Sequence, residues 1–165
     1  MVIRKIDTSI KRASGQKDEL RSYLLCPGMI QFNLRASQIV RGGPCVGHTI
    51  LVVEDTPDTR ELMKLMLEFE GYRVLEAENG REAVETALRE RPDAILMDMS
   101  LPVMDGCQAT RRMRARPELA SVPIIACTAH NRWEWRGKAI LAGCTDFITK
   151  PLDSKELAAM LLRYL

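Results

Sequence analysis

The sequence predicts an α/β fold, a doubly wound parallel β-sheet with helices on both faces. Apolar runs of four or five residues recur between residues 48 and 165, and longer segments with apolar residues at helical spacing separate them. Five alternations of this kind are typical of parallel strands joined by right-handed helical crossovers. The runs are apolar at nearly every position, as expected of strands buried on both faces of a sheet.

The five strands are predicted from these apolar runs, each bounded by Gly, Pro or polar residues. Thr-Ile-Leu-Val-Val at the start and Ala-Ile-Leu-Met in the middle are the clearest examples. The predicted strands are 49–53, 72–76, 94–97, 123–127 and 146–149.

The five helices are predicted from helical spacing together with start and stop signals. In chain order they are about 57–70, 81–90, 106–115, 132–142 and 154 to the end. Pro57 suits the first turn of the first helix, whose expected inward stripe is Leu62, Met63, Leu65, Met66 and Phe69. The other boundary signals are Asn79-Gly80, Pro92, Asp105-Gly106, Gly143, and Asp153 or Ser154.

Residues 1–47 are expected to precede the domain, which then covers residues 48–165. Four of the seven residues 41–47 are Gly or Pro, a composition typical of a linker. Two interpretations of the leader stay open. It is poorly ordered, or Ile3, Ile6 and Ile10 form a short amphipathic helix among basic residues for a membrane surface or a partner.

Charge and cysteine content exclude several classes of protein. The net charge is +2, with +5 in residues 1–47 and −3 in residues 48–165, so the domain lacks the basic surface of a nucleic-acid binder. No run approaches 18 apolar residues, and the start does not resemble a secretory signal. The five cysteines form no C-x-x-C pair, which favours free thiols in the cytoplasm.

Polar residues stand where four of the predicted strands end. Glu54-Asp55 follow the first strand, Asp98 the third, Thr128 the fourth, and Lys150 the fifth. The carboxyl ends of parallel strands share one edge of a sheet, where ligands bind at the switch point in strand order. We therefore expect these side chains in one crevice.

This set of residues suits phosphoryl transfer to the lone carboxylate. A carboxylate attacks phosphorus to form an acyl phosphate, and the transfer needs positioning and charge neutralisation more than proton chemistry. Glu54 and Asp55 supply oxygens for Mg²⁺, which binds few carboxylates and keeps waters. Lys150 offers a compact positive charge, and Thr128 a hydroxyl donor.

Each residue also has a structural alternative. Asp55 before Thr56-Pro57 fits a helix N-cap, and Asp98 before Leu-Pro fits an Asx-turn. Thr128 needs no role beyond the strand end. Lys150-Pro151 fits a solvated loop, and the sequence does not show whether that bond is cis.

Residues 48–165 resemble the response-regulator receiver domains of two-component signalling. The matching motifs are Ile-Leu-Val-Val-Glu54-Asp55, Asp98-Met-Ser-Leu-Pro-Val-Met-Asp105-Gly106, Thr128-Ala129 and Phe147-Ile-Thr-Lys150-Pro151. The resemblance implies a flavodoxin-like strand order, 2-1-3-4-5. It also implies that Asp98 accepts a phosphoryl group from a histidine kinase or a phosphotransfer protein.

The resemblance further implies a metal site and a switch. Glu54, Asp55, Asp98 and the Ser100 carbonyl would hold Mg²⁺ or Mn²⁺. After phosphorylation Thr128 would move toward the phosphate and Phe147 would turn inward. The surface of the fourth helix, fifth strand and fifth helix would then change, and a downstream protein would bind it. The alternative is that Phe147 is simply a core residue.

Four more residues are candidates for secondary roles in such a domain. Ser100 and His130 lie two residues beyond Asp98 and Thr128, where they would influence the lifetime of the phosphate. Trp133 and Trp135 are two residues apart on a helix, so both cannot face the core, and one is a candidate partner anchor.

Because the chain ends with the fifth helix, the leading expectation is a stand-alone receiver and not a turnover enzyme. A haloacid-dehalogenase-like phosphohydrolase is one alternative. Those enzymes have a second Asp two residues after the nucleophile, where this chain has Ser100, and a nucleophile on the first strand. A pseudo-receiver that binds partners without phosphorylation is the other alternative.

Overall fold

The computed structural model describes residues 47–129 and 133–165, with the backbone alone at 133–135. The predicted leader lies almost wholly outside the described residues, so it and the boundary at residue 47 stay predictions. The strands are β1 Thr49–Val53, β2 Arg73–Ala77, β3 Ala94–Asp98, β4 Ile124–Thr128 and β5 Asp146–Thr149. The helices are α2 Pro57–Phe69, α3 Gly80–Glu90, α4 Gly106–Arg114, α5 Trp133–Ala142, α6 Ser154–Leu161 and the 3-10 turn η2 Pro117–Leu119.

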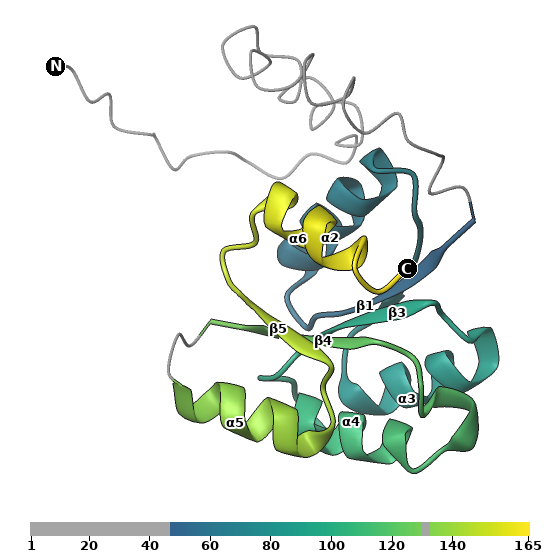
Figure 1. Ribbon diagram of the computed structural model, residues 1–165, viewed down its shortest axis with the longest axis vertical. Coiled ribbons are helices and arrows are strands. Elements are labelled where there is room, and N and C mark those ends of the chain that lie inside the picture. Colours follow the sequence, from purple (N-terminus) through teal and green to yellow (C-terminus); the bar gives the residue numbers. More distant parts are fainter. Residues whose placement is uncertain (1–46, 130–132) are drawn as a thin grey trace, which may run out of the picture. The chain divides into compact units, whose positions relative to one another are not determined.

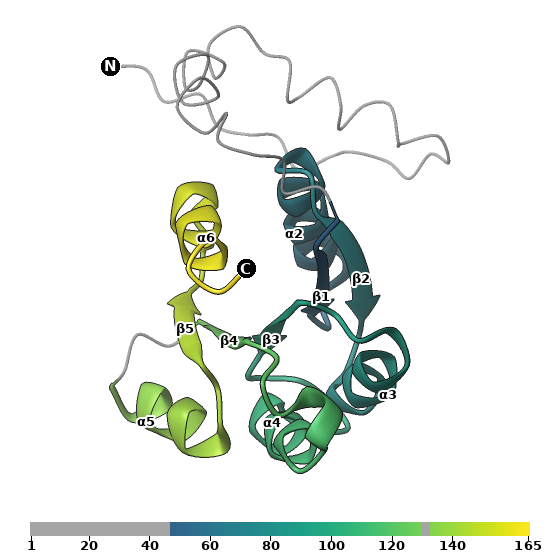
Figure 2. The same cartoon turned by 45° about the vertical axis from the view of Figure 1, so that its right-hand side comes forward.

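The strands form one parallel sheet in the order β2-β1-β3-β4-β5. Helices α2 and α6 cover one face, and α3, α4 and α5 cover the other (Figures 1 and 2). The doubly wound fold and its strand order are therefore confirmed. Each strand-to-strand connection passes through a helix, as parallel pairing requires.

Two cores lie on the two faces of the sheet, because alternate residues of a strand point to opposite sides. Leu51 and Val53 of β1 join the core under α3, α4 and α5. Ile50 and Val52 join the core under α2 and α6. Cys127 on β4 belongs to the second core, as expected of a small apolar residue, and burial raises the pKa of its thiol to about 12.

Helix α2 buries a narrower stripe than its sequence predicts. Met63 and Leu67, one turn apart, are buried. Leu62 and Phe69 are 58% and 88% exposed, so the prediction that they face the core is wrong. They lie roughly 100° or more around the helix axis from Met63 and Leu67, and the neighbouring elements cover only the Met63–Leu67 side.

The helix boundaries follow the predicted signals closely. Asn79, Asp105 and Asp153 accept backbone N–H bonds as the N-caps of α3, α4 and α6. Gly143 after α5 has φ +104°, a conformation that favours glycine. The turn η2 was not predicted. At eight to thirteen residues, no α-helix in the described part is long and apolar enough to cross a membrane.

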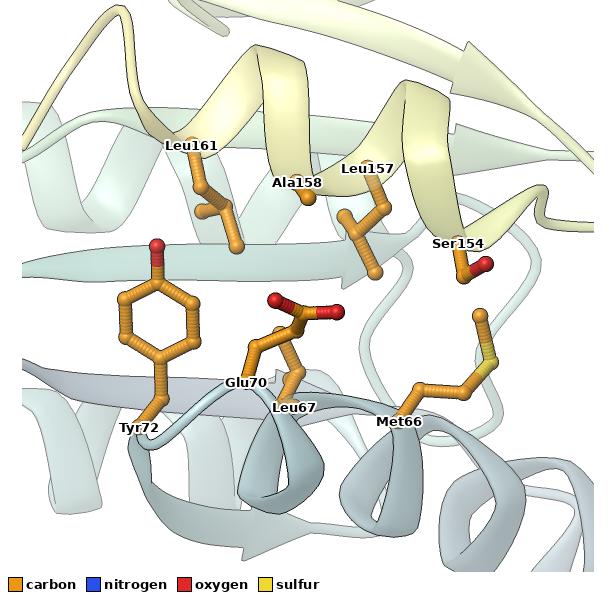
Figure 3. A pocket seen from close by; sticks show the side chains of 8 residues that line it. All are labelled: Met66, Leu67, Glu70, Tyr72, Ser154, Leu157, Ala158 and Leu161. Atoms are coloured by element: carbon orange, nitrogen blue, oxygen red, sulfur yellow. The ribbon is translucent and has the colours of Figure 1, made fainter. Parts of the chain in front are cut away.

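Between α2 and α6 lies a shallow groove at the outer edge of the second core (Figure 3). Leu157 and Leu161 point from α6 toward α2, and Tyr72 stands beside Leu161. The groove is lined by Met66, Leu67, Glu70, Tyr72, Ser154, Leu157, Ala158 and Leu161. The groove runs along the second half of α2, whereas the polar strand ends gather near the start of that helix.

Candidate functional site

The polar strand ends lie together at the carboxyl edge of the sheet. Glu54 follows β1, Asp98 is the last residue of β3, Thr128 is the last of β4, and Lys150 follows β5. Strands β1 and β3 are adjacent, yet the chain leaves β1 for α2 on one face and β3 for α4 on the other (Figure 2). This is the switch point where ligands bind in open α/β sheets.

Three carboxylates cluster at this switch point. Glu54, Asp55 and Asp98 each offer one oxygen, and the three oxygens lie within 4.8 Å of one another. Glu54 and Asp98 are buried, at 2% and 6% exposure, whereas Asp55 is exposed. Like charges this close repel one another, so the cluster favours a cation.

Lys150 supplies one positive charge to the cluster. Its Nζ donates to Asp98 Oδ2 at 2.8 Å and also to Glu54 Oε2. Burial lowers the pKa of Lys150, but the hydrogen bonds and charges of Asp98 and Glu54 outweigh burial and hold that pKa above its usual 10.5. Its side chain is 19% exposed, so the solvated-loop alternative is wrong. The Lys150-Pro151 bond is cis.

The backbone after β3 orients the Asp98 carboxylate. The Ser100 N–H donates to Asp98 Oδ1 at 3.0 Å, so Asp98 does form the Asx-turn that was its alternative role. Gly106 is needed in the following turn because a Cβ at that position would lie 2.3 Å from the Asp98 carbonyl oxygen. The Ser100 N–H thus binds Oδ1, and Lys150 Nζ binds Oδ2 of the same carboxylate.

This arrangement belongs to a known family. The sequence model of the response regulator receiver domain matches residues 50–162, more than two thirds of the chain. The chain is a response regulator receiver domain. The match favours the receiver over a haloacid-dehalogenase-like phosphohydrolase.

Relatives of different length match this chain. The protein PilH of Pseudomonas aeruginosa is 37% identical over 66% of this chain and 89% of its own length. The phosphate regulon transcriptional regulatory protein PhoB of the same species is 38% identical over 70% of this chain. The chain spans about half (51%) of PhoB.

Solved structures are similar to this chain in fold as well as in sequence. The receiver domain of a Pseudomonas aeruginosa sensor histidine kinase, described with a magnesium ion coordinated in its active site cleft, is 44% identical at a TM-score of 0.69. That match covers 72% of this chain and 98% of the other. The chemotaxis protein CheY4 of Vibrio cholerae is 30% identical at a TM-score of 0.68, over 72% of this chain and 98% of its own.

Asp55 is the exposed member of the acid cluster in this receiver. Helix α2 has Thr56 as its N-cap, without a side-chain capping bond, so the N-cap alternative for Asp55 is wrong. Thr56 Oγ1 lies 3.4 Å from Asp55 Oδ1. Lys150 binds Glu54 and Asp98, and the described bonds include none from Lys150 to Asp55. The Asp55 charge therefore faces the other two acids and solvent.

Replacing Asp55 by asparagine is expected to raise the midpoint of thermal unfolding by a few degrees in Mg²⁺-free buffer, because the substitution removes repulsion from the cluster. The same variant should bind Mg²⁺ more than roughly 10-fold more weakly, because a carboxylate oxygen is lost. Thermal unfolding with and without Mg²⁺ measures both effects. Asp58→Asn, on the exposed side of α2, is the matched control. A D55N variant less stable than wild type in chelator would contradict the repulsion argument.

The two residues of the predicted switch lie on neighbouring strands. Thr128 is buried at 6% exposure and pairs with Thr149 on β5. Phe147 is half-buried against the core under α3, α4 and α5. The Arg136 guanidinium lies over its ring, with Cζ 4.4 Å from the ring centroid. Phe147 therefore has contacts on both its core side and its outer side.

The remaining predicted site residues are placed only in part. Ser100 is exposed beside Asp98. His130 and the side chains of Trp133 and Trp135 lie outside the described residues, so their predicted roles stay predictions.

One residue at the site, Arg60, was not predicted from the sequence. Its Nη1 donates to the Glu54 carbonyl oxygen at 2.7 Å, directly behind the acid pair. A basic residue in the second turn of a helix is common, and nothing local distinguishes it. Glu54 follows β1, and the other two partners of Arg60 are Glu76, within β2, and Glu78, directly after β2. Only the folded chain brings these groups together.

Proposed function

We propose that Asp98 accepts a phosphoryl group from a phosphohistidine and that the receiver signals through the phosphorylated state. One Asp98 oxygen attacks phosphorus, the P–N bond to the imidazole breaks, and the electron pair leaves with that nitrogen. The observation that carries the proposal is the position of Lys150 Nζ, hydrogen-bonded to Asp98 beside two further acids.

The residues of this site fit a magnesium ion. The donors are oxygens only, as a hard cation requires, and Asp55 is exposed, which leaves room for bound waters. Glu54, Asp55, Asp98 and the Ser100 carbonyl would hold the ion; Mn²⁺ would bind the same donors. The bound ion supplies positive charge against the oxygens of the transferred group. The magnesium described in the similar kinase receiver supports this part of the proposal.

Lys150 and Thr128 then act on the transferred group. Lys150 keeps its charge through neutral pH, because its pKa is raised, and so offers an ammonium to one phosphoryl oxygen. The Thr128 hydroxyl, on the adjacent strand β4, offers a hydrogen bond to another. Ser100, exposed next to Asp98, and His130 are our candidates for control of the lifetime of the acyl phosphate.

The response to phosphorylation is a shift in the surface formed by α5, β5 and α6. We propose that movement of Thr128 lets the Phe147 ring turn inward and that a downstream protein binds the changed surface, with Trp133 and Trp135 as candidate contacts. A histidine kinase or a phosphotransfer protein donates the phosphoryl group, and nucleic acid is not the ligand. The described cysteines, Cys107, Cys127 and Cys144, are free thiols, which suits the cytoplasm.

Intact-mass measurement tests the proposal. Incubation with Mg²⁺ and acetyl phosphate should add about 80 Da to the wild type, the mass of one phosphoryl group bound as an acyl phosphate. The Asp98→Asn variant, which keeps the size of the side chain, should gain nothing. An inert wild type would instead identify a pseudo-receiver, and steady turnover of a phosphate ester would identify a phosphohydrolase.

A further inference from the structure

Arg60 of α2 lies behind the cation site and contacts two of its surrounding segments at once. Its Nη1 donates to the Glu54 carbonyl at 2.7 Å, and its Nη2 donates to Glu78 Oε1 at 3.0 Å. Its Nε is 3.5 Å from Glu76 Oε2. The Arg60 side chain is only 12% exposed, and its bond to the Glu54 carbonyl is partly shielded from solvent, whereas Glu78 is 67% exposed.

Glu54 is held at four atoms, and Arg60 holds the one nearest to Asp55. The Glu54 N–H donates to the Ala77 carbonyl of β2, and its carboxylate accepts from Lys150 and from the Thr56 N–H. The fourth atom is the carbonyl oxygen bound by Arg60. The Glu54–Asp55 peptide is planar, so a fixed carbonyl also fixes the direction in which the chain reaches the Asp55 Cα.

We infer that Arg60 is a positioning residue for the cation site: it sets the Glu54–Asp55 peptide plane and through it aims the exposed Asp55 carboxylate at the cluster. This inference rests on the proposed function, because it assigns Arg60 a part in building the Mg²⁺ site. A guanidinium fork binds several oxygens in fixed directions, which a lysine ammonium cannot reproduce.

A purely electrostatic role would have the opposite signature. Arg60 is positive, so its charge alone opposes a nearby cation, and removing that charge would tighten Mg²⁺ binding. A positioning role instead predicts weaker Mg²⁺ binding in both cases: when a lysine keeps the positive charge without the guanidinium fork, and when a glutamine removes the charge. Arg60→Lys and Arg60→Gln therefore separate the two roles.

The experiment titrates Mg²⁺ by calorimetry into the wild type, R60K and R60Q and into the control Lys64→Met. Lys64 lies one turn further along α2 and binds Glu76 at 2.6 Å, so it shares the network but does not hold Glu54. We expect both Arg60 variants to bind Mg²⁺ about 10-fold more weakly, as is usual when a residue that orients metal ligands is lost, and K64M to bind as the wild type does. The rate of phosphorylation by acetyl phosphate should recover in R60K at saturating Mg²⁺.

Two Mg²⁺-binding results would overturn the inference alone: R60K binds Mg²⁺ as well as the wild type does, whatever its thermal stability, or R60Q binds Mg²⁺ more tightly than the wild type. A phosphorylation rate in R60K that stays low at saturating Mg²⁺ would also overturn it, because positioning of the ligands would then not account for the defect. A wild type that binds no Mg²⁺ would overturn the metal part of the proposed function and this inference with it. The titration of the wild type therefore distinguishes the two failures.

Discussion

Replacing Lys150 by methionine is expected to lower the free energy of unfolding by about 3 kcal/mol in Mg²⁺-free buffer, the usual cost of removing one partner from a buried ion pair. The substitution leaves Glu54 and Asp98, whose side chains are 3% and 8% exposed, close together without their shared ammonium. Methionine keeps much of the side-chain volume, so the loss reflects charge and hydrogen bonding more than packing.

Magnesium should restore part of this loss, because a cation bound by the acids replaces the missing positive charge. Urea unfolding of the wild type and K150M, each with chelator and with Mg²⁺, measures both effects. Lys155→Met, at an exposed position on α6, is the control, because the interactions of an exposed charge contribute about 1 kcal/mol or less. If K150M were as stable as the wild type in chelator, the Lys150 contacts would contribute nothing to folding.

The contribution of Lys150 also has a defined pH range. Its pKa is raised above 10.5 in the folded protein by the bonds to Asp98 and Glu54, which outweigh burial. A raised pKa of a basic group stabilises the fold fully below the unfolded pKa and loses that effect only as the pH rises through the folded pKa. The difference between wild type and K150M should therefore be constant through neutral pH and shrink above pH 10.5.

Replacing Arg114 by methionine is expected to lower the free energy of unfolding by about 3 kcal/mol, because three partly buried backbone carbonyls lose their donor at roughly 1 kcal/mol each. Arg114 Nε donates to the Gly143 carbonyl at 2.8 Å, and Nη1 donates to the carbonyls of Leu119 and Val122 at 2.9 and 2.8 Å. Nη2 reaches Thr145 Oγ1 at 3.2 Å. The Arg114 side chain at the end of α4 thus bonds to η2 at Leu119, to the segment before β4 at Val122, and to the turn after α5.

Burial lowers the pKa of Arg114, yet the guanidinium stays charged because its intrinsic pKa lies far above neutral pH. Urea unfolding of R114M and of Arg112→Met, an exposed position on the same helix, separates this network from general helix effects. Arg114→Lys should fall between R114M and the wild type, because an ammonium cannot reach all four acceptors. Mg²⁺ binding should be unchanged in all three variants, and a Lys variant as stable as the wild type would show that the fork geometry is not needed.

The strands and most helix ends could be predicted because their signals are local. An apolar run such as Ile50–Val53 has to be buried on both sides wherever it lies, and β1 was predicted to the residue. The caps Asn79, Asp105 and Asp153 bond to N–H groups two or three residues away, so their sequence neighbours suffice.

Predictions failed where neighbours from distant parts of the chain decide the outcome. Helical spacing placed Phe69 on the inward side of α2, but the width of the buried stripe depends on what packs against the helix, and Phe69 is exposed. Arg60 and Arg114 were missed for the same reason. The oxygens that accept their hydrogen bonds lie on other elements, and no local sequence pattern predicts that a guanidinium will connect those elements.

The candidate site divides along the same line. The residue types at the strand ends, together with the parallel topology, were enough to predict that Glu54, Asp55, Asp98, Thr128 and Lys150 gather at one edge of the sheet. That Lys150 bonds to Glu54 as well as Asp98, that Asp55 stays exposed, and that Arg60 holds the peptide between the two acids emerged only from the folded chain. Strand-end position is a property of the local sequence, whereas hydrogen-bond partners 52 and 96 residues apart depend on distances that exist only after the sheet has formed.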